Sequence, residues 1–153
     1  MNINTLVLTL IFSFTVIMGC DGDNSTGSNG VTITDLVGTW TATKFEFTNE
    51  VDPDQKIDLI QLGGSFILNI NSDGEFSAIL TVPGESPDTS SGTLRIQNGT
   101  LFFDDDSSDD VTAEFTLSRN TLTLTISADD AEIDFDDDGQ DDPATLLIIL
   151  QRS

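Results

Sequence analysis

The feature that most constrains the fold is an alternation of apolar and polar side chains that recurs along most of the chain. In the segment 75–82, for example, Phe76, Ala78 and Leu80 occupy every second position. This period of two is that of a β-strand with one buried face, because successive side chains of a strand point to opposite faces. No segment shows a convincing helical period of 3.6 residues, so the sequence predicts an all-β domain.

Turn-forming residues separate the alternating segments and predict how the strands connect. Asn98-Gly99 is the strongest two-residue hairpin signal in the chain, and residues 71–74 and 119–120 mark two further tight turns. The alternation slips by one position near Lys44, which indicates a β-bulge. The eight predicted strands are 38–48, 65–71, 75–82, 92–97, 100–103, 111–117, 121–127 and 145–152.

Strands joined by consecutive tight turns form an antiparallel, up-and-down sheet. Such a sheet must bury its apolar face and hide its edge strands, and closing into an eight-stranded β-barrel does both. A barrel of this size is either filled by its own side chains or holds one small ligand. Phe66, Phe76 and Phe115 are candidates to line a ligand pocket, or else to fill a closed core. Between strands, 83–91 is a predicted polar loop, whereas 52–62 fits a loop, a short helix or an extra strand.

The start of the chain differs from the rest and predicts export and lipid anchoring. The apolar run at 6–18 is about 13 residues long, which suits a secretory signal, whereas a membrane-spanning helix needs about 20. The run ends in Ile17-Met18-Gly19-Cys20, which resembles the lipobox of bacterial lipoproteins. This resemblance implies that residues 1–19 are a signal peptide and that Cys20 becomes the lipid-bearing first residue of a protein of the bacterial cell envelope. The alternatives are an ordinary cleaved signal near a cysteine and an uncleaved anchor.

The charge of the chain restricts its partners. Five Lys and Arg residues stand against 27 Asp and Glu, a net charge of −22, which repels nucleic acid and anionic lipid head groups. Membrane attachment is therefore expected to rest on the lipid at Cys20 alone. Residues 21–30 contain no apolar side chain and are typical of a flexible tether, so the folded domain is expected at 31–153.

The residue types present leave few routes to catalysis. The chain has no histidine and one cysteine, which excludes His-dependent triads, Cys- or His-based zinc sites and internal disulfides. Only paired carboxylates remain as candidate catalytic groups, and the acids are so numerous that no pair stands out. We therefore predict that the protein is not an enzyme.

One acidic segment has the spacing of a calcium-binding loop. Its acids occupy positions 1, 3, 5 and 9 of such a loop, and Gly139 stands at the turn position 6. Thr145 stands at position 12, where a calcium loop usually has a bidentate glutamate, so any calcium binding is expected to be weak, with a Kd of about 10⁻⁴–10⁻³ M. The alternative is a solvated acidic loop. The candidate ligands are Asp134, Asp136, Asp138, Gln140 through its backbone carbonyl, and Asp142.

Several motifs together resemble the lipocalin-like domain of small bacterial lipoproteins. They are Gly38-Thr39-Trp40, the hairpins at 71–76 and 98–101, and the terminal Gln151-Arg152. The resemblance implies an eight-stranded lipocalin-like barrel that Gly38 and Trp40 close at one end, with Arg152 packed over the tryptophan ring. It also implies a membrane-anchored protein that binds a small apolar ligand or a protein partner. The alternative is a calcium-stabilised structural or interaction module with a filled barrel, and the oligomeric state is left open.

Overall fold

The computed structural model describes residues 30–106, 110–127, 131–136 and 139–153. These residues form one short helix and ten strands, and no helix among them is long and apolar enough to cross a membrane. Cys20 and the predicted signal peptide lie outside the described residues. The elements are α1 (Ile33–Leu36), β1 (Gly38–Asn49), β2 (Lys56–Asp58), β3 (Ser65–Ile70), β4 (Glu75–Thr81), β5 (Asp88–Gln97), β6 (Thr100–Asp105), β7 (Val111–Ser118), β8 (Thr121–Ile126), β9 (Glu132–Ile133) and β10 (Asp142–Arg152).

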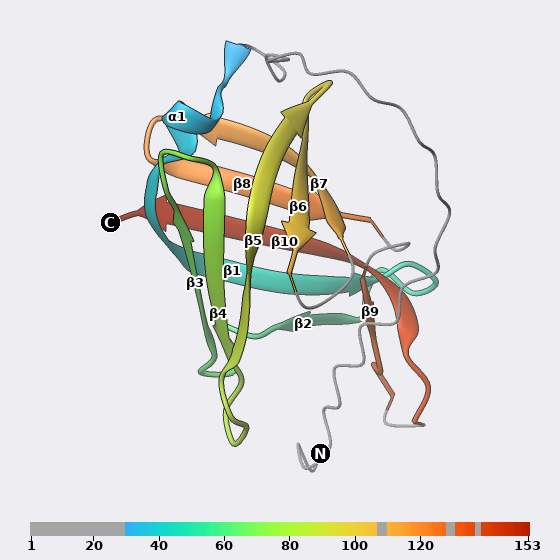
Figure 1. Ribbon diagram of the computed structural model, residues 1–153. Helices are drawn as coiled ribbons and strands as arrows, with labels where there is room; N and C mark the ends of the chain where they lie inside the picture. The colour runs from blue at the N-terminus through green and yellow to red at the C-terminus, as the bar shows by residue number, and fades with distance from the viewer. Residues whose placement is uncertain (1–29, 107–109, 128–130, 137–138) are drawn as a thin grey trace.

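Eight of these strands close into an antiparallel β-barrel (Figure 1), which confirms the predicted fold class. Neighbouring strands pair in the order β1, β3, β4, β5, β6, β7, β8 and β10, and β1 pairs with β10 to complete the ring. The closing pair runs from Trp40 opposite Arg152 to Asn49 opposite Ala144. The other two strands are short: β2 pairs with the second half of β1, and β9 pairs with the start of β10.

All eight predicted strands are present, and the differences lie at their ends. The register between β1 and β10 shifts beside Lys44, at the predicted bulge. Strand β5 begins at Asp88 and not at Gly92, because the backbone of 88–91 pairs with β4 despite its polar side chains. The predicted polar loop is correspondingly shorter. Within 52–62, strand β2 corresponds to the extra-strand alternative.

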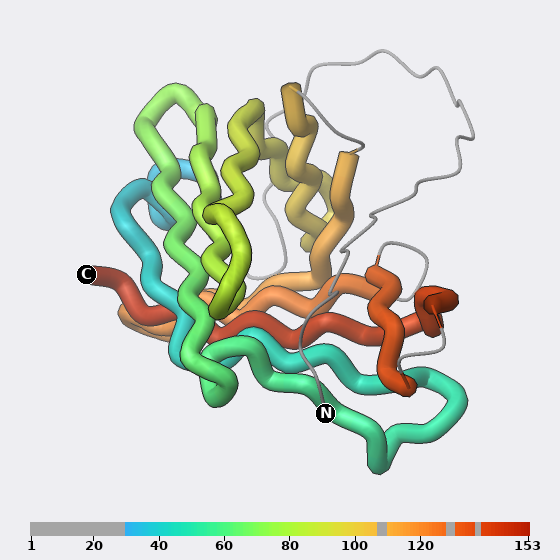
Figure 2. The backbone as a smooth tube through the Cα atoms, turned by 90° about the horizontal axis from the view of Figure 1, so that it is seen from below, coloured from blue at the N-terminus to red at the C-terminus, as the bar shows by residue number. Residues whose placement is uncertain are grey.

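The barrel is flattened into two layers that enclose the core. Figure 2 shows β3, β4, β5 and β6 as one layer, with β1, β8 and β10 running across it as the other. The side chains between the layers are apolar: in β8, Leu122, Leu124 and Ile126 are buried, whereas the threonines between them are half-buried. This burial determines the strand register, because a slip by one residue would turn the apolar side chains outward.

The two ends of the barrel differ. At the closed end, α1 and the start of β1 meet the end of β10, and the strands are joined by the tight turns between β3 and β4, β5 and β6, and β7 and β8. At the open end the connections are longer, and two of them carry the short strands β2 and β9. The open-end connections are the described residues within 50–64, 82–87, 106–110 and 127–141.

Candidate ligand-binding site

Trp40 seals the closed end of the barrel beneath α1. Its side chain has no exposed surface, and its indole Nε1 donates a hydrogen bond of 2.7 Å to the carbonyl oxygen of Leu36. The guanidinium carbon of Arg152 lies 4.4 Å from the centroid of the indole ring, a cation–π contact of the kind that contributes about 0.5–2 kcal/mol. Arg152 also donates a hydrogen bond from Nη2 to the carbonyl oxygen of Asp35. The arginine therefore connects the end of β10 to both Trp40 and α1.

The backbone around Trp40 suits this closure. Gly38 has a φ of +140°, in the region that favours glycine, and a Cβ atom there would lie 3.7 Å from the Cγ and Cδ atoms of Arg152. The carboxylate of Asp35 accepts hydrogen bonds of 2.9 and 2.8 Å from the amide and hydroxyl of Thr32, which hold the pKa of Asp35 below its usual value. Gly38, Trp40 and Arg152 thus lie together at one end of the barrel.

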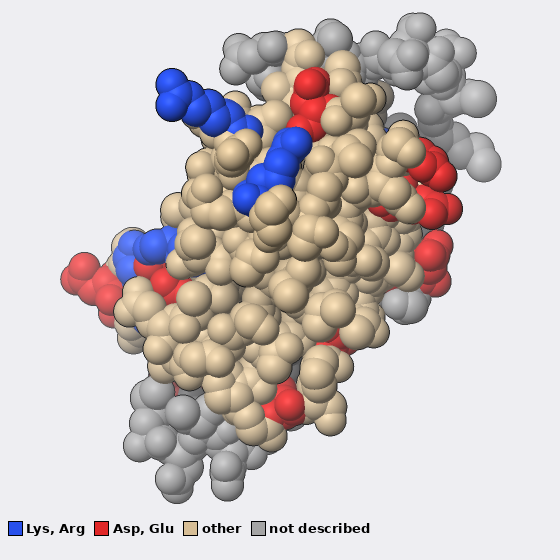
Figure 3. Space-filling model, turned by 90° about the vertical axis from the view of Figure 1, so that its left-hand side faces the viewer, with Lys and Arg blue, Asp and Glu red and all other residues tan. Residues whose placement is uncertain are grey.

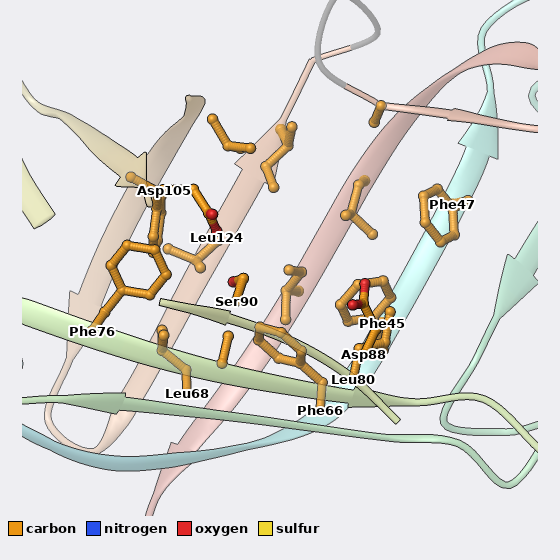
Figure 4. Close-up of a pocket in the computed structure, with 17 residues that line it drawn as sticks. Phe45, Phe47, Phe66, Leu68, Phe76, Leu80, Asp88, Ser90, Asp105 and Leu124 are labelled. Atoms are coloured by element: carbon orange, nitrogen blue, oxygen red, sulfur yellow. The ribbon is translucent and has the colours of Figure 1, made fainter. Parts of the chain in front are cut away.

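The half of the barrel away from Trp40 is hollow. It holds a cavity of about 250 Å³ that is lined mainly by apolar side chains (Figure 4). Phe45 packs against Phe66 with the ring centroids 5.2 Å apart, and Phe76 packs edge-on against Phe103 at the same distance. The phenylalanines that line the cavity are Phe45, Phe47, Phe66, Phe76 and Phe103.

The three phenylalanines proposed from the sequence as pocket residues differ in their position relative to the cavity. Phe66 and Phe76 line the cavity, whereas Phe115 is not among its lining residues. Val111 lines the cavity at the start of β7, and Phe115 follows further along that strand, toward the closed end. Phe115 is only 7% exposed and belongs to the buried core of the barrel, so its place in a ligand pocket stays a prediction from the sequence.

Three polar residues also line the cavity: Asp88, Ser90 and Asp105. Asp88 lies opposite Leu80 of β4, and Asp105 lies opposite Gly92 of β5. The alternation does not predict Asp88 or Ser90 as site residues, because 83–91 has the composition of a loop. The signal that identifies them is their phase, since they lie on the same face of β5 as Gly92 and the buried residues that follow it.

A comparison with known families agrees with this geometry. A family model described as a lipocalin-like domain matches residues 36–124, which extend from the end of α1 through most of β8. The chain belongs to this lipocalin-like family. No curated protein matches the chain. Strands β9 and β10 follow the matched region, and β10 completes the lipocalin-like barrel through its pairing with β1 and β8.

Asp58 fixes the chain of the lipocalin-like barrel where it leaves β2. Its carboxylate accepts hydrogen bonds from the amides of Phe45 and Ile60, at 3.2 and 3.0 Å, and from the side-chain amide of Gln61 at 3.0 Å. Partial burial acts to raise the pKa of Asp58, but these hydrogen bonds outweigh it and hold the pKa below its usual value. The charged carboxylate thus holds the connection after β2 against β1, beside Phe45, which lines the cavity.

The proposed calcium loop is described in part. The carboxylate of Asp134 accepts hydrogen bonds from the amides of Asp136 and Gly139, at 3.2 and 2.9 Å, and Gly139 has a φ of +87°. Asp142 accepts a bond of 3.4 Å from the amide of Phe135. Asp138 lies outside the described residues, and the residues that are described contain no group of three His, Cys, Asp or Glu placed to hold a metal. Calcium binding at 134–142 therefore stays a prediction from the sequence.

Proposed function

We propose that this protein is a lipid-anchored lipoprotein of the bacterial cell envelope whose lipocalin-like barrel binds a small apolar ligand. The observation that carries the binding role is the phenylalanine-lined cavity of about 250 Å³. Typical ligand pockets have volumes of about 300–1,000 Å³, and a cavity of about 150 Å³ is enough for benzene. The cavity therefore suits a small ligand, such as one aromatic ring with a short chain or a single alkyl chain.

The hollow half of the barrel favours a ligand over the alternative of a filled structural module. In the closed half, Leu122 and Leu150 have no exposed surface, and the core is packed around Trp40. In the other half, the apolar side chains of the wall border empty space, and a ligand there would supply the contacts that they lack. Binding without catalysis is part of the proposal, since the chain has no histidine and a single cysteine, which lies in the proposed lipobox.

Filling the cavity with a protein side chain tests the binding role. Ala78 lines the cavity and is 9% exposed, so Ala78→Phe should place a phenyl ring in the ligand's space. We expect the affinity for 1-octanol, a neutral probe, to fall at least about 10-fold, measured by isothermal titration calorimetry of the full chain in lipid nanodiscs. Ile79→Phe is the matched control, because Ile79 is the next residue of β4 and is 38% exposed.

Folding is checked in the same preparations by circular dichroism, and Ser90→Phe provides a second obstruction from the opposite strand. Unchanged affinity for 1-octanol in a folded Ala78→Phe or Ser90→Phe chain would contradict binding in this cavity.

Lipid anchoring is tested at Cys20. When the full chain is expressed in bacteria that are given radiolabelled palmitate, we expect label in the wild-type chain and none in Cys20→Ala. The chain has no other cysteine to modify, so the loss should be complete. Ser25→Ala, in the predicted tether, should be labelled like the wild type. A labelled Cys20→Ala chain, or an unlabelled wild-type chain, would refute the anchor.

A further inference from the structure

Two carboxylates line the mainly apolar cavity, and we infer that the cavity selects a small amphiphile with a positively charged end. Asp88 and Asp105 are lining residues together with Ser90, and every other lining residue that the structure describes is apolar. The described lining contains no lysine or arginine. This inference rests on the proposed ligand-binding function and names the chemical class of the ligand.

The strand register explains why these charges face the interior. Asp88 and Ser90 have the same phase on β5 as Leu94 and Ile96, whose side chains are buried in the core. Asp105 ends β6 two positions after Phe103, which also lines the cavity. On both strands, the inward-facing side chains are therefore apolar near the closed end of the barrel and polar near its open end. Figure 4 shows the oxygen atoms of Asp88, Ser90 and Asp105 among the apolar side chains of the wall.

The site has a polar end, at Asp88, and an apolar part deeper in the barrel. Asp88 is exposed, so water reaches its carboxylate at the open end, whereas Leu68 and Phe76 line the cavity as buried residues. A ligand that fills the space takes water away from the exposed carboxylate of Asp88 and lies beside that of Asp105. An apolar group does not compensate for that loss, and an anionic group adds repulsion. An ammonium group instead replaces water with a charge-assisted hydrogen bond.

Charged side chains around the opening of the cavity favour a cationic ligand at longer range as well. The described residues of the open-end connections, within 50–64, 82–87, 106–110 and 127–141, include 11 Asp or Glu and a single basic residue, Lys56. The side that carries the C-terminus is mostly uncharged and shows both basic and acidic side chains (Figure 3). A negative potential concentrated at one end attracts cations toward that end and repels anions. The ligand class that fits both the wall and the opening is an alkylammonium or aromatic ammonium ion.

The test compares three ligands that share an eight-carbon chain: octylammonium, 1-octanol and octanoate. Each is titrated calorimetrically into the full chain in nanodiscs of neutral lipid, with empty nanodiscs as the blank. We expect octylammonium to bind about 10-fold more tightly than 1-octanol, and octanoate at least about 10-fold more weakly. Raising the NaCl concentration should weaken the binding of octylammonium and leave that of 1-octanol unchanged.

Amide substitutions assign the preference to the lining carboxylates. Asp88→Asn and Asp105→Asn should each lower the affinity for octylammonium about 5-fold or more while leaving that for 1-octanol unchanged. Glu85→Gln is the matched control, because Glu85 is an exposed acid of the open end that does not line the cavity. Equal affinities of octylammonium and 1-octanol, or equal effects of all three substitutions, would overturn the inference and leave the binding function standing. Failure of all three ligands to bind would overturn both.

Discussion

Replacing Trp40 with alanine is expected to lower the free energy of unfolding by about 3–5 kcal/mol, the range for large aromatic side chains removed from a core. The indole ring has no exposed surface, so its removal leaves a void beneath α1. The substitution also leaves the buried carbonyl of Leu36 without its 2.7 Å hydrogen bond and removes the ring on which Arg152 rests.

The measurement is urea unfolding followed by far-ultraviolet circular dichroism, because Trp40 is the only tryptophan and its fluorescence is lost with the substitution. Trp40→Phe keeps an aromatic ring but not the indole donor, and its cost should be smaller, about 1–3 kcal/mol. Ile79→Ala is the control at an outward position, with an expected change below about 1 kcal/mol. A Trp40→Ala chain that unfolds at the same urea concentration as the control would show that the closed end is not held by the indole.

The strands were predictable because burial follows from local alternation. In β8 the apolar residues fall on every second position, and the structure buries all three of them. The start of β5 was not predictable in this way. Asp88 and Ser90 are polar at inward positions, so the local pattern is that of a loop, and they become strand residues because their backbone pairs with β4. That pairing depends on residues elsewhere in the chain.

The site was less predictable than the fold. Alternation indicates which phenylalanines point inward, but it does not give the separation of the two layers of the barrel. Phe66 borders the cavity and Phe115 does not, although both lie on inward faces. The contact of Trp40 with Arg152 joins the two ends of the domain sequence and forms because β1 pairs with β10. Only the resemblance to the lipocalin-like family implied this contact from the sequence.

Replacing Gly92 with alanine is expected to disrupt the wall between β5 and β6. A Cβ atom at this position would lie 1.9 Å from the carbonyl oxygen of Asp104 and 2.9 Å from its carbonyl carbon. Both are backbone atoms, so no side chain can rotate away, and the two strands must separate. Alanine in place of a strand glycine otherwise stabilises by about 0.5–1 kcal/mol through chain entropy, so any destabilisation has a steric cause.

We expect Gly92→Ala to lower the free energy of unfolding by more than about 3 kcal/mol, as measured by urea unfolding. Ser91→Ala is the matched control, because Ser91 is the preceding residue of β5 and is exposed. Strand β6 carries Phe103 and Asp105 into the cavity wall, so any Gly92→Ala chain that folds should also bind 1-octanol and octylammonium more weakly. A Gly92→Ala chain as stable as Ser91→Ala would mean that β5 and β6 do not approach closely at Asp104. In that case the place of Asp105 in the cavity wall would have to be revised, since it rests on the same strand pairing.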